Sequence, residues 1–524
     1  MTRPTGGGVA VEDDRHLHRL ARGSGLNLIG AATSSAASFG VIFVVTNAFD
    51  QATAGGLFAG TALFMLIVTV AGLGADVGLA RWVPHLMASG RTADVRRCMR
   101  SAGTAVLVTS GVAAAVMAVP SSPLTGLVGG DAPGVDLAQG IRVLAAFVPV
   151  MTVFMLLLAA TRAYGTMRPT VVVDKIVRST GQVVLVVVAA VIGTELGWLA
   201  AAWALPLLPA TAWAGLWLRR VATRARDAVR PHLDTAPDGD DAVRAFWRFT
   251  LPRALGQVVQ TAIQRVDVLL IAALLGVRDA AVYTAATRFM VFGQMGIQAI
   301  QQMLQPQLSR LFADGDHPAA KSVFAAATTW TILLTWPPYI LFAGLAPSLL
   351  VVFGDGYGEG ATTVSILCAA MLVSTATGPV DVVLLMAGRS GLSLGNNAVA
   401  LVLNVVLNIV LLPRVGITGA AIAWSVAIVV RNLLPLWQIR REVGFTLAGG
   451  KALRAAVLAG ATFGPAALVA RSAVELRWAP TLVLVGVATA AYGLGVWRAR
   501  GRLEVDILAR ALRRRRTPTA ASRP

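Results

Sequence analysis

Two apolar stretches of the chain carry glutamines and arginines at helical spacing. In the first, residues 250–275, five polar side chains fall within an arc of roughly 80° at about 100° per helical residue: Arg253, Gln257, Gln260, Gln264 and Asp267. Arg265 lies beside this arc. In the second, residues 282–307, four glutamines share an arc of roughly 60°, with Arg288 about a third of a turn away: Gln294, Gln298, Gln301 and Gln305.

These residue types indicate a binding surface rather than a catalytic one. A glutamine side chain offers donors and an acceptor without charge, which suits the binding and release of sugar hydroxyls. A guanidinium fork matches phosphate oxygens. The two helices are therefore predicted to line a cavity for a polar ligand with negative charge. The alternative is that the glutamines only bond helices to one another, as polar side chains do in membranes.

Several single residues have two interpretations. Arg253, near the end of its helix, either contacts ligand or extends its side chain to the membrane surface. Asp267 is either a protonatable coupling site or the partner of Arg265 or another arginine, and the pairing is favoured because its helix face has no second carboxylate. Asn404 and Asn408, one turn apart, are expected to bond neighbouring helices. We expect no metal and no cofactor, and no coupling ion is specified.

The elements that position these residues are membrane helices. Of 524 residues, 56% are hydrophobic and only 14% are charged, and the mean hydropathy is +0.70. The apolar runs match the length that crosses about 30 Å of hydrocarbon. The sequence predicts an all-α integral membrane protein with about fourteen helices, near residues 25–49, 57–80, 101–119, 142–161, 170–193, 196–218, 250–275, 282–307, 323–353, 361–386, 391–412, 416–438, 452–472 and 478–497.

The charge pattern predicts the topology. Most of the 45 Lys and Arg residues lie in alternate connections and in both tails, including four consecutive arginines at residues 513–516. Cytoplasmic connections carry this excess, so both termini are expected in the cytoplasm and the protein in the plasma membrane. The net charge of +19 does not indicate nucleic-acid binding, because the basic residues lie between apolar runs rather than on one compact domain.

An internal repeat divides the chain. A shift of 225 residues places GGLFAGTALFM, from Gly55, over AAVYTAATRFM, from Ala280, and a shift of 221 places LGWLAAAW, from Leu196, over ITGAAIAW, from Ile417. Parallel six-helix repeats are typical of transporters whose solute path lies between two lobes. The predicted units are a tail (1–24), an N-lobe of helices 1–6 (25–218), a cytoplasmic linker (219–249), a C-lobe of helices 7–12 (250–440), helices 13 and 14 (451–498) and a basic tail (499–524).

Three segments resemble a known family. GRSGLSLGNNAVALVLNVVLNIVLLPRVGITGAAIAWSVAIVV, from Gly388, resembles the helix 11 to 12 region of polysaccharide flippases in the multidrug/oligosaccharidyl-lipid/polysaccharide exporter superfamily. DVLLIAALLGVRDAAVYTAATRF, from Asp267, and VVFGDGYGEGATTVSILCAAM, from Val351, are similar to two further regions of that family. The resemblance implies a V-shaped exporter of fourteen helices that turns over lipid-linked glycans by alternating access.

The sequence leaves three candidate functions for this protein. The leading one is a flippase for an undecaprenyl-type lipid-linked oligosaccharide, with that glycan and the membrane lipids as partners, and glycan polymerases or glycosyltransferases as further candidates. A drug or metabolite antiporter of the same superfamily is second, because a site for organic cations needs more carboxylates and aromatic rings than the two polar helix faces offer. A membrane glycosyltransferase or ligase is third: its longest outside loop, 121–141, offers only Asp131 and Asp136 as acid or base. The protein is thus expected to be a transporter and not an enzyme.

Overall fold

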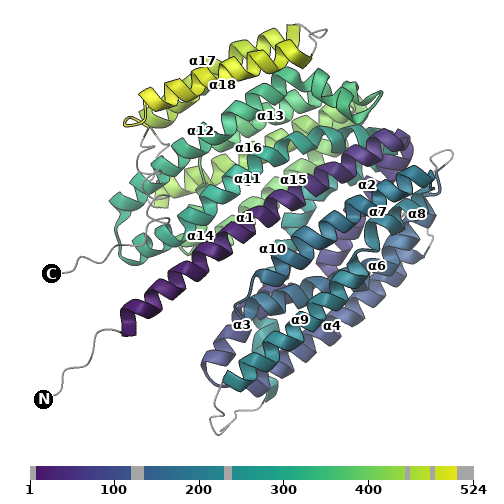
Figure 1. Ribbon diagram of the computed structural model, residues 1–524, viewed down its shortest axis with the longest axis vertical. Helices are drawn as coiled ribbons and strands as arrows, with labels where there is room; N and C mark the ends of the chain where they lie inside the picture. Colours follow the sequence, from purple (N-terminus) through teal and green to yellow (C-terminus); the bar gives the residue numbers. More distant parts are fainter. Residues whose placement is uncertain (1–7, 120–134, 229–238, 443–448, 473–477, 504–524) are drawn as a thin grey trace, which may run out of the picture.

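The computed structural model describes residues 8–119, 135–228, 239–442, 449–472 and 478–503, and all regular structure in these ranges is helical. The long helices run nearly parallel and form two groups, with α1 lying lengthwise between them (Figure 1). The first group comprises α1 (Gly8–Ala48), α2 (Gln51–Ala71), α3 (Ala75–Ala88), α4 (Thr92–Ala118), α6 (Leu137–Ala163), the π-helix η1 (Thr170–Arg178), α7 (Ser179–Ile192), α8 (Leu196–Ala204) and α9 (Leu207–Ala228).

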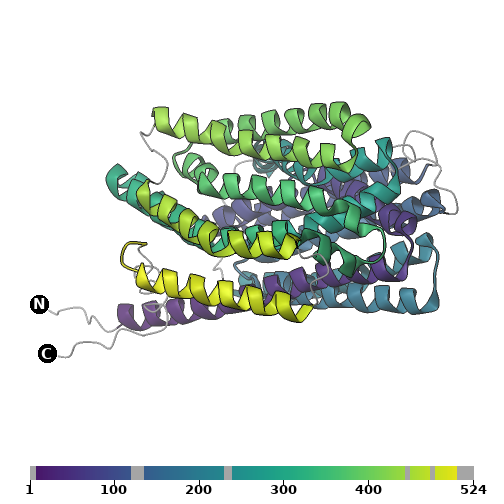
Figure 2. The same cartoon turned by 90° about the horizontal axis from the view of Figure 1, so that it is seen from above.

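The second group comes next along the chain. It comprises α10 (Gly239–Leu274), α11 (Val277–Ala313), α12 (His317–Leu350), η2 (Val351–Phe353), η3 (Tyr357–Gly360), α13 (Ala361–Ala376), α14 (Val380–Met386), α15 (Ser390–Val415) and α16 (Ile417–Glu442). Two more helices, α17 (Gly450–Ser472) and α18 (Trp478–Arg498), complete the described chain. Helix α17 packs along α12, and α18 packs on α17, at the edge of this group (Figure 2).

The number of spans agrees with the prediction. In the described chain, thirteen helical segments are long and apolar enough to cross a membrane, with α2 and α3 counted as one segment. Helix α11 is as long as these but is not among them, because its glutamines lower its hydropathy. Together they make fourteen, so the prediction of an all-α membrane protein with about fourteen helices is confirmed. The protein is a multi-pass membrane protein.

Some predicted boundaries differ from the structure. Helix α1 begins at Gly8, so the described part of the predicted tail 1–24 is helical. The predicted linker 219–249 includes the last turns of α9 and the first turns of α10, and residues 229–238 lie outside the described residues. Asp131 and the four arginines at 513–516 also lie outside them. Cys98 and Cys368 are both buried and free.

Helix α10 is shared between the two lobes. Ala242 and Phe246 are buried in the core that α3 and α4 form in the first lobe, and the Trp247 indole donates to Ser101 Oγ at 2.9 Å. Farther along, α10 packs against α15 of the second lobe. The burial of Phe246 explains why this segment is helical although charged residues surround it, since aromatic burial supplies much of the stability of a core.

The lobes also meet where α1 ends and α2 begins. The Asn47 amide donates to the Val352 carbonyl at 3.0 Å, and the Gln51 amide donates to the Asp355 carbonyl at 3.1 Å. Gly55 lies so close to α11 that a Cβ there would overlap the Val277 carbonyl oxygen. We call these contacts the lobe junction. They bring together α2 and α11, the two helices that the internal repeat equates.

Candidate substrate cavity

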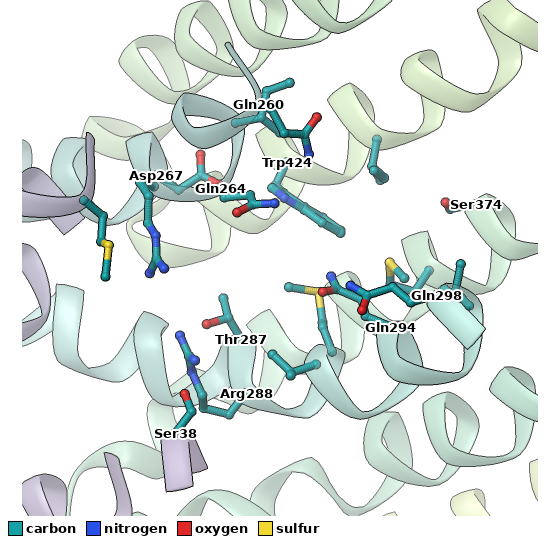
Figure 3. A pocket seen from close by; sticks show the side chains of 18 of the residues that line it. Ser38, Gln260, Gln264, Asp267, Thr287, Arg288, Gln294, Gln298, Ser374 and Trp424 are labelled. Carbon is teal, nitrogen blue, oxygen red and sulfur yellow. The ribbon is translucent and has the colours of Figure 1, made fainter. Parts of the chain in front are cut away.

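A cavity of about 810 Å³ lies between the lobes, lined by residues of α1, α2, η1, α7, α8, α10, α11, α12, α13, α14 and α16. Gln260, Gln264 and Trp424 face Thr287, Gln294 and Gln298 across it (Figure 3). Nine of the eleven predicted residues line this cavity: Gln260, Gln264, Arg265, Asp267, Arg288, Gln294, Gln298, Gln301 and Gln305. The cavity therefore brings together side chains from both of the polar helix faces that the sequence singled out.

The other two predicted residues lie elsewhere. The exposed Arg253 guanidinium stacks on the Phe249 ring, 3.7 Å from its centroid, and donates to the Phe249 carbonyl at 3.0 Å. The Gln257 amide donates to Asp76 Oδ2 of α3 at 3.0 Å. Both belong to the part of α10 that lies against the first lobe. The polar arc of α10 thus faces the first lobe at one end and the cavity at the other.

Arg265 and Arg288 have no carboxylate partner among the residues that the structure describes. Ion pairs in this part of the chain include Arg91 and Arg97 with Asp94, and Arg178 with Asp174. Arg288 donates to the Thr284 carbonyl of its own helix at 3.3 Å, and no side-chain partner is found for Arg265 in the described chain. A charge inside a membrane protein without a partner requires water or a counter-ion. These two groups therefore leave positive charge available to a ligand in the cavity.

Asp267 does not pair with an arginine, so the favoured interpretation of this residue was wrong. Its Oδ1 accepts from the Asn408 amide at 2.9 Å, and its Oδ2 accepts from the Tyr283 hydroxyl at 3.4 Å. The Asn408 amide also donates to the Asn404 carbonyl at 2.9 Å. The carboxylate satisfies neutral donors instead, and it joins α10 to α15. This is the helix-bonding role that was expected of the two asparagines.

Sequence reasoning missed several polar cavity residues, among them three on η1, α7 and α16. The Arg178 guanidinium donates to Asp174 at 2.7 Å and to Gln182 Oε1 at 2.9 Å, and Gln182 in turn donates to the Trp203 carbonyl. Arg431 donates to Gln260 Oε1 at 3.2 Å across from α16. Arg431 is a single arginine within an apolar run, the same signal as at Arg265 and Arg288, and that signal could have found it. Arg178 follows Asp174 and Lys175 by one turn, so its segment gives no such signal.

The hydrogen bonds separate two kinds of glutamine. Gln257 and Gln260 bond to side chains of other helices, as the packing interpretation requires. Five cavity glutamines make no side-chain hydrogen bond to any residue that the structure describes: Gln264, Gln294, Gln298, Gln301 and Gln305. Gln264, Gln298 and Gln305 are exposed, and Gln294 and Gln301 are half-buried. All five line the cavity, so their donors and acceptors are available to water or to a ligand.

Two groups of helices around a polar cavity are the arrangement found in membrane transporters. The fold is similar to the lipid II flippase MurJ in an inward closed conformation, with a TM-score of 0.69, 11% identity and coverage of 92% of this chain and 99% of that one. It is also similar to a multidrug resistance MATE family transporter of the MOP superfamily in its inward-facing conformation, with a TM-score of 0.63, 14% identity and coverage of 78% and 94%. At such identities the likeness establishes the fold alone.

The family is identified from the sequence itself. The model of the polysaccharide biosynthesis protein family matches residues 20–312, more than half of the chain, and the protein belongs to that family. A relative from Haloferax volcanii, described as the probable low-salt glycan biosynthesis flippase Agl15, is 23% identical over 208 residues. That match covers 39% of this chain and 44% of the relative. Each of these three proteins is described as a flippase or a transporter.

Proposed function

We propose that the protein flips a lipid-linked oligosaccharide across the plasma membrane through the cavity between its lobes. One observation carries this proposal: the cavity combines Arg265 and Arg288, which have no carboxylate partner, with five glutamines that bond to no side chain, in both cases among the residues that the structure describes. Arginines suit a phosphate or diphosphate, and unbonded amides suit sugar hydroxyls. Membership of the polysaccharide biosynthesis protein family and the flippase among its relatives support the same substrate class.

The charge balance of the cavity favours an anionic ligand. Four arginines line it, against two aspartates: Arg178, Arg265, Arg288 and Arg431, with Asp267 and Asp381. A cleft with an excess of one sign attracts ligands of the other sign. An organic cation, the substrate of the antiporter alternative, would meet repulsion here. The diphosphate of a lipid-linked glycan would be attracted.

The lobe junction provides the element that must change during transport. Both termini are assigned to the cytoplasm on the distribution of Lys and Arg, which places the junction near the external face. With the contacts of Asn47, Gln51 and Gly55 made, the cavity is closed toward that face. We infer that release of the glycan outside requires these contacts to separate while the lipid tail stays in the bilayer. This is alternating access by movement of the two lobes.

Reconstitution tests the proposal. The protein is placed in liposomes that contain a fluorescent lipid-linked oligosaccharide in one leaflet, and its appearance in the other leaflet is measured. Arg265→Ala and Arg288→Ala should each lower the flipping rate by about tenfold or more, because a charge-assisted hydrogen bond contributes about 1.5–3 kcal/mol. The exposed Arg310, at the end of α11 and outside the cavity, is the matched control, and Arg310→Ala should flip at the normal rate. Normal rates in both cavity variants would refute the assignment.

A further inference from the structure

The cavity glutamines of α11 form a straight row. Gln294, Gln298, Gln301 and Gln305 are separated by four, three and four residues, close to one helical turn each time, so the row runs parallel to the helix axis. From Gln294 to Gln305 the row extends along about 16 Å of helix at about 1.5 Å per residue. It begins about 9 Å along the helix axis from Arg288 and ends about two turns before the last residue of α11, away from the lobe junction.

Only this face of α11 has the pattern. On another face, Ile300, Leu304 and Leu308 are buried in the core of the second lobe. Gln302 and Gln307 are also on α11 and are exposed, but they do not line the cavity. The row is therefore distinct from the general polarity of this helix. It places one amide on each successive turn, and each amide lacks a protein partner among the described residues.

We propose that this row is a length gauge for the glycan, holding an extended chain of about four sugars at about one sugar per helical turn. The inference rests on the proposed function and specifies it further. The diphosphate end lies at Arg265 and Arg288, and the sugars extend along α11 toward Gln305. A pyranose ring is about as long as one turn of α-helix, so successive sugars meet successive amides. Each amide can donate to one hydroxyl and accept from another.

The chemistry of the row suits a substrate that must also leave. A single neutral hydrogen bond exchanged against water contributes little, and four in series add affinity in steps with each further sugar. Arginines along the whole row would hold an acidic glycan too strongly to release it. The positive charge is instead concentrated at the end where every lipid-linked substrate has its phosphates. Length discrimination thus comes from the amides alone.

The gauge predicts effects that depend on both position and glycan length. Proteoliposomes are loaded with fluorescent lipid diphosphates that carry a monosaccharide, a disaccharide or a tetrasaccharide, and flipping is measured for each. Gln305→Ala should slow the tetrasaccharide by about fivefold and leave the monosaccharide unchanged, because only the longer chain reaches this amide. Gln294→Ala should slow all three substrates by a similar factor. Gln302→Ala and Gln307→Ala are the matched controls and should change none of the rates.

Three results would bear differently on the two proposals. If the wild-type protein flips none of the lipid-linked sugars, the proposed function fails. If it flips them but Gln305→Ala slows the monosaccharide and the tetrasaccharide equally, the function stands and the gauge is overturned. The gauge is also overturned if Gln302→Ala reproduces the effect of Gln305→Ala. Elution volume in gel filtration and the thermal unfolding midpoint of each purified variant establish that the rates compare folded proteins.

Discussion

At the scale of single residues, the hydrogen-bond partners decide the role of each polar group inside the membrane. The sequence treated all glutamines of α10 and α11 alike, because helical spacing gives a direction but not a neighbour. The structure separates Gln257, bonded to Asp76, from Gln294 and Gln298, which face the cavity without a partner. Asp267 is the clearest case: its spacing placed it near Arg265, but the asparagines of α15 satisfy its carboxylate. A contact made by a helix far away in the sequence cannot be derived from the periodicity of one segment.

The bond between Asp267 and Asn408 makes a testable prediction of coupling. Asp267→Ala leaves the Asn408 amide and the Tyr283 hydroxyl short of an acceptor, and Asn408→Ala leaves the buried carboxylate without its best donor. Each change should destabilise the protein by about 1–3 kcal/mol. Because the two groups share one interaction, the free energy of unfolding should fall less in the double variant than the sum of its falls in the two single variants.

Thermal unfolding in detergent measures this coupling. The midpoint of the double variant should lie above the value that the added single shifts give. Asn432 provides the matched control, since its amide bonds to Ser374 and to its own helix and not to Asp267. In the double variant of Asp267→Ala and Asn432→Ala, the shift of the unfolding midpoint should therefore equal the sum of the two single shifts. Additive shifts for Asp267→Ala and Asn408→Ala would mean that the bond does not contribute to stability.

At the scale of elements, most helices could be predicted because about twenty consecutive apolar residues leave few alternatives in a membrane. The exceptions have physical reasons. A polar linker was predicted for the first turns of α10, because Asp241, Arg244 and Arg248 lie among them. In the structure these turns are helical, and Phe246 is fully buried in the first lobe. The π-helix η1 was not predicted, since its ring of hydrogen bonds leaves no mark on hydropathy. Both features depend on packing against distant parts of the chain.

The shared helix α10 leads to a prediction about Phe246. Although it lies at the start of the second repeat, Phe246→Ala should destabilise the first lobe by about 3–5 kcal/mol, the usual cost of removing a buried phenylalanine. Phe249→Ala is the matched control: Phe249 is only half-buried and stacks on Arg81 and Arg253. The thermal unfolding midpoint should fall much further for Phe246→Ala. Equal midpoints would show that the first turns of α10 do not belong to that core.

At the scale of the whole molecule, two sets of contacts join the lobes. Along one edge, α10 continues into the core of the first lobe, so this connection persists through any movement that leaves the core intact. At the lobe junction the contacts are two amide-to-carbonyl hydrogen bonds and the close approach of Gly55 to Val277. These polar contacts adjoin a hydrophobic core that buried residues of α2 and α11 share, so opening the junction also exposes apolar surface. We expect the lobes to separate at this junction during transport.

Gly55 offers a direct test of this view. Any side chain at residue 55 overlaps the Val277 carbonyl oxygen, so Gly55→Val should force α2 and α11 apart and populate the arrangement in which the lobe junction is open. Spin labels at the exposed residues Glu195 and Glu359, one on each lobe, should then report a longer mean distance than in the parent protein. Gly111→Ala is the matched control, because a Cβ at that helical glycine meets no atom within 4 Å. An unchanged distance distribution in Gly55→Val, with the variant still folded, would show that the junction yields locally and that opening must begin elsewhere.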